Sequence, residues 1–501
     1  MGNSEKVINK RTTKIIKWFK NYNNLLLFSL LAFTIIIRLY FFIKTFNQPL
    51  WWDEADYLSI AKFWAFGFPF DISIVRQVLW PLILTIFLSI SNTELLPRIF
   101  MLALSVTSVI ALYYLGKEMF DNKVGLLSAF LMSVFYLNLF FSFRLLVDLP
   151  SLAFFTLSAF FIYRYFKTKS NTALYTGSVL IGIGTLFKIS TATLLFAVLI
   201  YLFTTQRFKM FLKKEIWIAL LIFFLVLSPY IIWGFFQFNK FVITAAGAYN
   251  APQPGMFFST GFANLIGYFS LFQEYLSWLI LITFILGLLS LYKLIIGFDV
   301  LLKNQNQPLN TDWFLFLILL IPIIVVSFSV GHVENRYIIN AFPAVFILSS
   351  VFLFKITDTL KKKYKILSVI IILLFILCTG YIQIQKTSSL IDSKKTSYLE
   401  VKEAGIWLKT YANQTDIVVA QSIPQIVYYS EKQAIGLPNT AEEMDELIKS
   451  NKNAKFLVVS IFENHPEWAY TYGQDNNLTI ANIYFSDKAR TQPALIIYNL
   501  H

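Results

Sequence analysis

An acidic pair, Asp53 and Glu54, follows the first hydrophobic segment of the chain. Trp51 and Trp52 come just before it, and tryptophan rings favour the interface between a membrane and water. We therefore expect both acids to be exposed to water while lying against the membrane surface. A carboxylate at such a place can accept the proton of a hydroxyl group that attacks a lipid-linked substrate. The pair predicts general-base chemistry at that surface.

Further acids and cations stand in the later connections between hydrophobic segments. A lipid phosphate that leaves a sugar needs positive charge from Arg or Lys, and the incoming hydroxyl needs a carboxylate. This division of roles describes the transfer of a sugar from a polyprenyl phosphate. The polar residues concerned are Asp56, Asp71, Arg76, Arg144, Asp148, Lys188, His332, Glu334, Asn335 and Arg336.

These residues also have structural interpretations. Charged side chains at helix ends are commonly solvated or anchored to lipid headgroups, which would account for Arg76, Arg144 and Lys188. Asp148 precedes Pro150 and could cap the N-terminus of a helix. Arg38, within the first hydrophobic segment, is interpreted as a cation that extends its head group to the interface.

The composition places most of the chain in a membrane. Hydrophobic residues make up 57% and charged residues 14% of the 501 residues, unlike an average soluble domain. The net charge of +14 could indicate a nucleic-acid partner, but residues 1–383 hold 31 Lys and Arg against 15 Asp and Glu, and residues 384–501 hold 11 against 13. The positive charge belongs to the membrane part, so we predict no nucleic-acid partner. The single cysteine, Cys378, excludes an intrachain disulfide and a cysteine-rich zinc site.

The apolar runs predict an all-α polytopic bundle. About 20 apolar residues are needed to cross a membrane, and about eleven runs reach this length. The run Val78–Ser91 covers only about half a span and is expected to lie in the interface as a helix of the first outer loop. The predicted spans centre near Thr34, Ser105, Ser133, Thr156, Leu180, Ala197, Phe224, Thr283, Ile321, Ile347 and Leu374.

The loops predict the orientation of this bundle. With the N-terminus in the cytoplasm, the internal loops hold 22 Lys and Arg, against 8 in the external loops before the last span. Cytoplasmic loops are enriched in these residues. We therefore expect a multi-pass plasma-membrane protein with a basic cytoplasmic N-terminus at 1–24 and a membrane domain at 25–383.

Residues 384–501 have a different character and are expected outside the cytoplasm. Short apolar runs at 417–420, 456–461, 478–485 and 494–498 predict strands, and 398–411 and 441–450 predict helices. A small extracytoplasmic α/β domain is therefore predicted. Two exposed-looking triplets, Asn413-Gln-Thr415 and Asn477-Leu-Thr479, could carry glycans there.

Five motifs in order resemble the signatures of one family. They are Trp52-Asp-Glu-Ala-Asp-Tyr57, Val75-Arg-Gln-Val-Leu-Trp-Pro81, the stretch Gly125–Pro150 that ends Arg-Leu-Leu-Val-Asp-Leu-Pro, Gly182-Ile-Gly-Thr-Leu-Phe-Lys188 and Asn335-Arg-Tyr-Ile-Ile-Asn-Ala-Phe-Pro343. The chain resembles the C-type (GT-C) glycosyltransferases over about residues 25–355, in the branch with protein O-mannosyltransferases and lipid A aminoarabinose transferases. The resemblance implies inverting transfer from dolichyl or undecaprenyl phosphate.

The resemblance also implies roles for single residues. Asp53 matches the catalytic base, with Glu54 as a supporting acid, and Asp148 matches an acid that orients the acceptor or, in some relatives, a divalent cation. Arg336 matches the arginine that contacts the lipid phosphate. The chain departs from the pattern after Arg76, where relatives carry a basic residue and consecutive prolines. No metal-ligand set can be matched, so no cofactor beyond that divalent cation is predicted.

The sequence therefore predicts a membrane glycosyltransferase, transferring a hexosyl or pentosyl group to a hydroxyl of a protein, glycan or lipid. Its catalytic residues are predicted to be Asp53, Glu54 and Asp148. The predicted substrate-binding residues are Arg336, Tyr337, His332, Glu334, Arg76, Arg144, Lys188, Tyr57 and Trp52. Gly182 and Gly184 are interpreted as helix-packing residues and not as a dinucleotide site. The loop 238–270 could close over the donor or simply lie in the interface. A transporter or flippase for lipid-linked sugars and a non-catalytic glycan-assembly subunit remain as alternatives.

Overall fold

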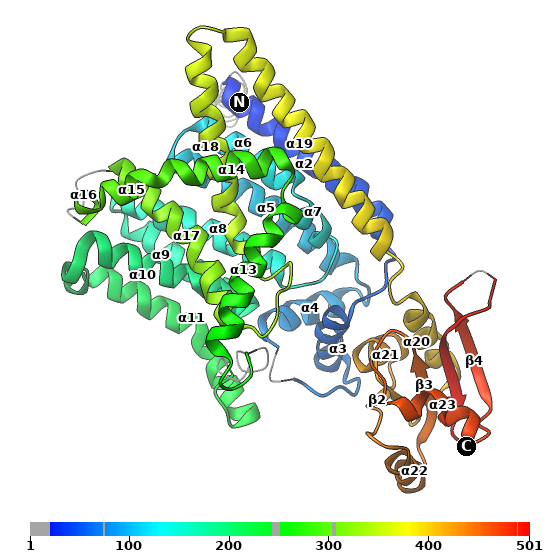
Figure 1. The fold of residues 1–501 in the computed structure, drawn as a ribbon. Helices are drawn as coiled ribbons and strands as arrows, with labels where there is room; N and C mark the ends of the chain where they lie inside the picture. The colour runs from blue at the N-terminus through cyan, green and yellow to red at the C-terminus, as the bar shows by residue number, and fades with distance from the viewer. Residues whose placement is uncertain (1–20, 74–75, 243–250, 303–306, 488) are drawn as a thin grey trace, which may run out of the picture. The chain divides into compact units, whose positions relative to one another are not determined.

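The computed structural model describes residues 21–73, 76–242, 251–302, 307–487 and 489–501. These residues form two compact units (Figure 1). The first unit contains the described parts of Met1–Lys44, Ile99–Phe143 and Val147–Ser389. The second contains those of Thr45–Arg98, Arg144–Leu146 and Leu390–His501. The second unit thus combines the first predicted outer loop with the C-terminal segment. The predicted N-terminal region falls almost wholly outside the described residues.

Among its described residues, the first unit contains helices and connecting segments but no strand. Its α-helices are α2 (Tyr22–Thr45), α5 (Leu95–Met119), α6 (Asn122–Val134), α7 (Tyr136–Phe141), α8 (Asp148–Thr168), α9 (Asn171–Phe187), α10 (Thr193–Gln206), α11 (Lys214–Phe238), α13 (Phe257–Tyr275), α14 (Trp278–Leu289), α15 (Lys293–Ile296), α16 (Phe298–Leu302), α17 (Gln307–Ser329), α18 (Phe342–Lys361) and α19 (Lys365–Lys394). Four short 3₁₀ helices, η1 (Ile189–Ala192), η2 (Arg207–Leu212), η3 (Ser290–Tyr292) and η4 (Ile339–Ala341), lie between them.

Nine helical segments within the described residues are long and apolar enough to cross a membrane. They coincide with nine of the predicted spans, so the protein is an integral membrane protein. The predicted spans near Ser133 and Leu180 are occupied by the shorter helices α6 and α9. The second half of the loop predicted at 238–270 is the start of α13, while residues 243–250 of that loop lie outside the described part of the chain.

The span predicted near Ser133 is broken at Phe135, where the backbone leaves the helical conformation with ψ 120° and separates α6 from α7. Such a break exposes carbonyl and amide groups that no helical partner satisfies. Side chains of other helices bind them here. The amide of Asn138 donates to the Met132 carbonyl at 3.2 Å, and the Tyr136 amide donates to Gln383 Oε1 at 3.0 Å.

Arg38 of α2 also binds at this break. Its guanidinium donates to the Ser133 carbonyl at 3.1 Å and to the Ser105 hydroxyl at 2.7 Å. The side chain is fully buried, so the prediction that Arg38 extends its head group to the interface is wrong. The C-terminal end of a helix carries partial negative charge, and the end of α6 therefore supplies part of the stabilisation that water would otherwise give to the cation.

The second unit begins with two helices, α3 (Trp52–Phe66) and α4 (Leu79–Ile90). Helix α4 coincides with the run that was predicted to be too short to span, since 12 residues extend about 18 Å. Helix α3 ends at Gly67, whose φ of 75° is the left-handed conformation typical of a helix C-terminus. The fold class predicted from the sequence, a helical membrane bundle with a small α/β domain, is confirmed.

The α/β domain contains a five-stranded mixed sheet in the order β2-β1-β3-β5-β4. Strands β1 (Ile417–Ala420), β2 (Gln433–Ile435) and β3 (Ala454–Ser460) are parallel, whereas β5 (Pro493–Asn499) runs antiparallel to β3 and to β4 (Ile480–Phe485). The helices are α20 (Leu399–Tyr411), α21 (Ile423–Ser430), α22 (Ala441–Ser450) and α23 (Glu467–Asp475). The predicted strands and helices all recur, while β2, α21 and α23 were not predicted.

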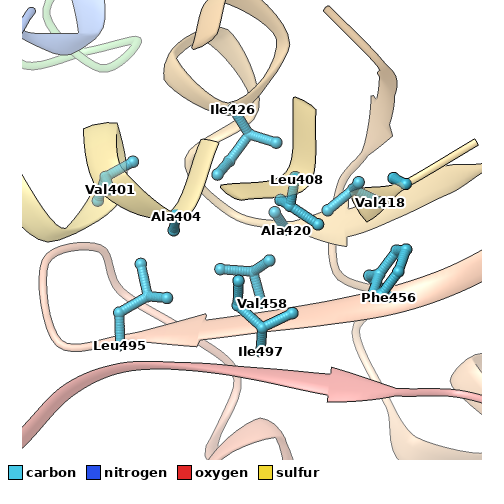
Figure 2. Packing of buried hydrophobic residues seen from close by; sticks show 11 residues of the cluster. Val401, Ala404, Leu408, Val418, Ala420, Ile426, Phe456, Val458, Leu495 and Ile497 are labelled. Atoms are coloured by element: carbon cyan, nitrogen blue, oxygen red, sulfur yellow. The ribbon is translucent and has the colours of Figure 1, made fainter. Parts of the chain in front are cut away.

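Alternation along the strands gives the sheet two apolar faces, because successive side chains point to opposite sides. On one face, Val418 and Val458 pack against Leu408 of α20 and Ile426 of α21 (Figure 2). On the other face, Leu457 and its neighbours pack against α22 and α23. The sheet is therefore covered by two helices on each side.

Helices α20 and α21 approach closely at Gly405. A Cβ atom at this position would lie 2.5 Å from the Cβ of Tyr429. We predict that Gly405→Ala lowers the free energy of unfolding of the second unit by about 1–3 kcal/mol, since overpacking forces neighbouring atoms to move. Thermal denaturation of the purified protein measures the change. Gly436→Ala is the matched control, because its Cβ would be 3.6 Å from the nearest atom; equal melting temperatures for both variants would contradict the prediction.

Candidate active site

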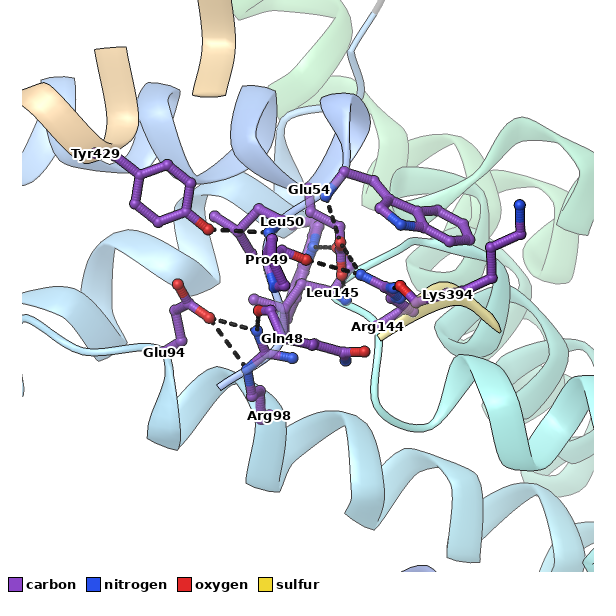
Figure 3. Close-up of polar contacts among 12 residues, drawn as sticks. Gln48, Pro49, Leu50, Glu54, Glu94, Arg98, Arg144, Leu145, Lys394 and Tyr429 are labelled. Atoms are coloured by element: carbon purple, nitrogen blue, oxygen red, sulfur yellow. Dashed lines mark hydrogen bonds and ion pairs between the residues drawn. The ribbon is translucent and has the colours of Figure 1, made fainter. Parts of the chain in front are cut away.

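The N-terminus of α3 is fixed by the buried carboxylate of Glu54 (Figure 3). Its oxygens accept hydrogen bonds from the Leu145 amide at 2.6 Å, the Trp51 amide at 2.8 Å and the Arg144 guanidinium at 3.1 Å. The bond from Trp51 belongs to a capping box at the start of the helix. The prediction that both acids of the pair face water is therefore wrong for Glu54, whose exposure is 0%.

Arg144 is the buried cation that pairs with Glu54. It also donates to the carbonyls of Pro49 at 2.9 Å and Lys394 at 3.1 Å, and its guanidinium lies 4.1 Å from the centre of a Trp51 ring. Burial lowers the pKa of Arg144, and the charge of Glu54 opposes this effect. The residue thus joins three separate segments of the chain beside the acidic pair.

Asp53 lies one residue before Glu54 but has a different environment. Its carboxylate accepts from Arg76 at 2.8 Å, and the same guanidinium donates to Asp56 at 2.5 Å. Burial raises the pKa of Asp56, while the adjacent Arg76 lowers it. The guanidinium also lies 5.1 Å from the centre of the buried Tyr57 ring. Trp52, the remaining predicted residue of this helix, is half-buried.

The side chain of Asp53 is 24% exposed. An external hydroxyl can therefore reach Asp53, whereas the oxygens of Glu54 are enclosed by protein donors. The structure brings Asp53, Glu54, Arg76, Arg144, Tyr57 and Trp52 into the second unit, around one helix end.

A second charged cluster lies in the first unit around Asp148. This buried acid is the first residue of α8, and it accepts from Lys188 Nζ at 2.5 Å. Lys188 ends α9, and Arg336 Nη1 lies 3.8 Å from the other Asp148 oxygen. Arg336 in turn pairs with Glu334 at 2.9 Å. Both cations are thus held by carboxylates while their side chains stay 16% and 20% exposed.

A second layer of polar side chains supports this cluster. Ser151, three residues after Asp148, contacts the Thr191 hydroxyl at 2.8 Å and accepts from Asn340 at 3.0 Å. All three residues are buried. They lie on α8, η1 and η4, the elements that carry or follow the charged residues. Gly184 lets these elements approach, because a Cβ there would be 2.5 Å from Thr191; the interpretation of Gly184 as a packing residue is confirmed.

The segment before η4 supplies the remaining predicted residues. The ring of Tyr337 lies 5.0 Å from Lys188 Nζ and 6.0 Å from the Arg336 guanidinium. Burial and then the neighbouring Glu334 raise the pKa of Tyr337, so its hydroxyl stays protonated near neutral pH. His332 is exposed, with its ring centre 5.7 Å from that of Tyr337. The structure therefore brings Asp148, Lys188, His332, Glu334, Arg336 and Tyr337 together.

Within the described ranges, no group of three His, Cys, Asp or Glu side chains is arranged to hold a metal ion. The acids described above are bound by Arg, Lys or backbone amides. The divalent cation expected from the resemblance stays a prediction.

Several residues of the second unit were not singled out from the sequence. The Arg98 guanidinium pairs with Glu94 and donates to the Gln48 carbonyl at 3.2 Å. Tyr429 accepts from the Leu50 amide at 2.9 Å. Arg98 carried a weak signal as one of few basic residues outside the predicted cytoplasmic loops. Tyr429 carried none, because its partner is 379 positions away.

Comparison with known families bears on this arrangement. Residues 76–233 match the family model described as dolichyl-phosphate-mannose-protein mannosyltransferase. That range includes Arg76, Arg144, Asp148 and Lys188. No curated protein sequence matches the chain.

Solved structures share the fold over nearly the whole chain. ArnT from Cupriavidus metallidurans bound to undecaprenyl phosphate superimposes with a TM-score of 0.65 at 9% identity, covering 94% of this chain and 97% of that one. The chain therefore has the fold of these glycosyltransferases, the C-type (GT-C) fold. The archaeal oligosaccharyltransferase of Archaeoglobus fulgidus, tethered to an acceptor peptide, gives a TM-score of 0.54 at 13% identity and covers 96% and 74% of the two chains. The predicted GT-C resemblance is confirmed.

We predict that Glu54→Gln lowers the free energy of unfolding by about 3–5 kcal/mol, because it leaves Arg144 buried without its counter-ion. Asp53→Asn should cost about 0–1 kcal/mol, since that ion pair is partly solvated. Thermal unfolding in detergent measures both effects. The buried role of Glu54 would be refuted by two variants of equal stability.

Proposed function

We propose that the protein is an inverting glycosyltransferase that moves a sugar from a polyprenyl monophosphate to an acceptor hydroxyl. The observation that carries the proposal is the pair of preorganised cations, Lys188 and Arg336, in a chain with the GT-C fold. The ArnT structure with the same fold was obtained with undecaprenyl phosphate. The archaeal enzyme AglB was obtained with dolichol phosphate, at a TM-score of 0.52 and 15% identity, over 89% of this chain and 70% of that one.

The two cations are suited to a leaving phosphate. Negative charge grows on the phosphate oxygens as the bond to the sugar breaks, and fixed donors stabilise that charge without reorganising. Arg336 would supply a guanidinium whose planar donors fit phosphate oxygens, and Lys188 a compact positive charge. Asp148 and Glu334 would hold these cations in place, and the Tyr337 hydroxyl would donate a further hydrogen bond.

The acidic pair would divide the work on the acceptor. Asp53 is assigned as the base because its carboxylate is partly exposed. It takes the proton of the attacking hydroxyl as the anomeric carbon inverts. Arg76 orients the Asp53 carboxylate through their ion pair. Glu54 acts as a positioning residue for Asp53, since its oxygens are bonded to Leu145, Trp51 and Arg144.

The donor and the acceptor are proposed as chemical classes. We infer a dolichyl or undecaprenyl donor with a hexosyl or pentosyl group, and a protein, glycan or lipid acceptor at the outer face of a plasma membrane. This orientation is supported by the excess of basic residues in the predicted cytoplasmic loops. Where a divalent cation takes part, Asp148 is the acid that we expect near it.

We predict that Asp53→Asn lowers kcat for sugar transfer by about 100-fold or more, the size of a lost general base. The purified protein is incubated with a panel of polyprenyl-phosphate sugars and acceptors, and mass spectrometry follows the donor consumed. Asp71→Asn is the matched control, because Asp71 is an exposed acid of the same loop. Full transfer by Asp53→Asn would overturn the assigned base, and transport of intact donor by the wild type would favour a flippase.

We predict that Arg336→Gln raises the KM for the lipid donor by about 10-fold or more, because charge-assisted hydrogen bonds to a phosphate contribute about 1.5–3 kcal/mol. Arg336→Lys should retain part of the affinity, since the charge remains but the planar donors are lost. Arg164→Gln, at an exposed position of α8, is the control. The phosphate role of Arg336 is incorrect if both kcat and the KM are unchanged.

A further inference from the structure

Residues 47–51, which lie between α2 and α3, form no helix or strand, and their backbone is held by side chains outside this segment. Segment 47–51 is bound in this way at every residue. Lys402 donates to the Asn47 carbonyl. Arg98 donates to the Gln48 carbonyl, Arg144 to the Pro49 carbonyl, and the Leu50 amide donates to Tyr429 (Figure 3). The Trp51 amide donates to Glu54. The path of this segment therefore depends on contacts that are remote in sequence.

Two of these side chains belong to the C-terminal α/β domain. Lys402 lies on α20 and Tyr429 on α21. The Lys402 contact is exposed, whereas Tyr429 and Leu50 are buried. At a buried position, water does not replace a partner that a backbone amide has lost. The Tyr429 bond is therefore the stronger constraint that this domain places on the segment. Leu50 lies three residues before Asp53.

Tyr429 is itself held firmly. Gly405 of α20 packs against its Cβ, and its ring lies edge to face with that of Tyr428 at 5.1 Å. Helix α21 is also bonded to α3, through Ser59 to the Pro424 carbonyl at 3.0 Å and Lys62 to the Tyr428 carbonyl at 3.0 Å. The Tyr429 hydroxyl therefore belongs to a closely packed helix that is itself hydrogen-bonded to α3.

We infer that Tyr429 is a positioning residue for Asp53, so that the C-terminal α/β domain forms part of the scaffold of the catalytic base. This inference rests on the proposed function of Asp53. Tyr429 does not touch the reacting atoms in this account. Its hydroxyl fixes Leu50, Leu50 fixes the start of α3, and the first turn of α3 carries the carboxylate.

Tyr429→Phe tests the inference, because it removes the hydroxyl and keeps the ring. In the full-length protein, kcat should fall by about 10–100-fold, since small misplacements of a catalytic group have effects of this order. The KM for the lipid donor should stay within about twofold, because the cations assigned to the phosphate belong to other segments. The pH dependence of kcat/KM should keep both its acidic and its basic limb at their wild-type positions. Loss of the basic limb would mean that Tyr429 itself acts as an acid, and this result would overturn the inference.

Tyr472→Phe is the matched control. Tyr472 is another buried tyrosine of the same domain, and its hydroxyl donates to Asp445 at 2.5 Å. This variant should lose stability without losing kcat. An equal fall of kcat in both variants would show that general destabilisation of the domain is responsible, and it would overturn a specific role for Tyr429.

Hydrogen exchange separates this inference from the proposed function. In Tyr429→Phe, the peptide containing residues 46–53 should exchange at least about 10-fold faster than in the wild type, because the Leu50 amide has lost its acceptor. Tyr472→Phe should leave this peptide unchanged. If the wild type transfers no sugar, the proposed function fails, and unchanged exchange in Tyr429→Phe overturns the inference independently of any activity.

Discussion

The buried carboxylate of Glu54 is the constraint on which the organisation of the second unit depends. A charge without water must be compensated by close donors, and here two backbone amides and a guanidinium do so. Each donor comes from a fixed place in the chain. The start of α3, the segment at residues 144–146 and the chain before α20 are consequently held together by one side chain and its partner Arg144.

In the first unit a buried acid also fixes charged side chains, but there the cations are the groups that stay partly exposed. Asp148 is buried so that Lys188 and Arg336 are held, and the cations keep part of their surface exposed. Hydrogen bonds among Ser151, Thr191 and Asn340 join the three supporting elements. The two buried acids thus differ in their partners. The cations bound by Asp148 stay partly exposed, whereas Arg144, bound by Glu54, is buried. Both arrangements are preorganised, which is what electrostatic catalysis requires.

Much of this could be predicted because membranes impose simple rules. Nine spans followed from apolar length, and strands such as β1 and β3 followed from short β-branched runs. The residue types of the site also followed, since a lipid phosphate and a hydroxyl acceptor demand cations and an acid. The break at Phe135 did not follow, because an apolar run gives no signal that its helix stops. Helix α21 was missed because its run is short and includes Pro424.

The division of labour within the acidic pair could not be predicted either. Asp53 and Glu54 are chemically alike and adjacent, so only the fold decides which one is enclosed. The amide that encloses Glu54 is 91 positions away, and the tyrosine that fixes Leu50 is 379 positions away. A helical period or a motif carries no information about contacts at such separations. The resemblance to GT-C enzymes implied a catalytic role for Asp53 by analogy, and the partial exposure of its carboxylate supports the role that we propose.

The position of Arg38 has a consequence for how the protein is made. An arginine within a helix that faces lipid costs about 2.5–3.5 kcal/mol during insertion, yet its partners Ser105 and Ser133 are synthesised well after α2. Until α5 and α6 enter the bilayer, α2 carries a charge that lipid does not solvate. The integration of α2 therefore becomes more favourable when the later helices arrive, so this span gains part of its stability only after it has been made.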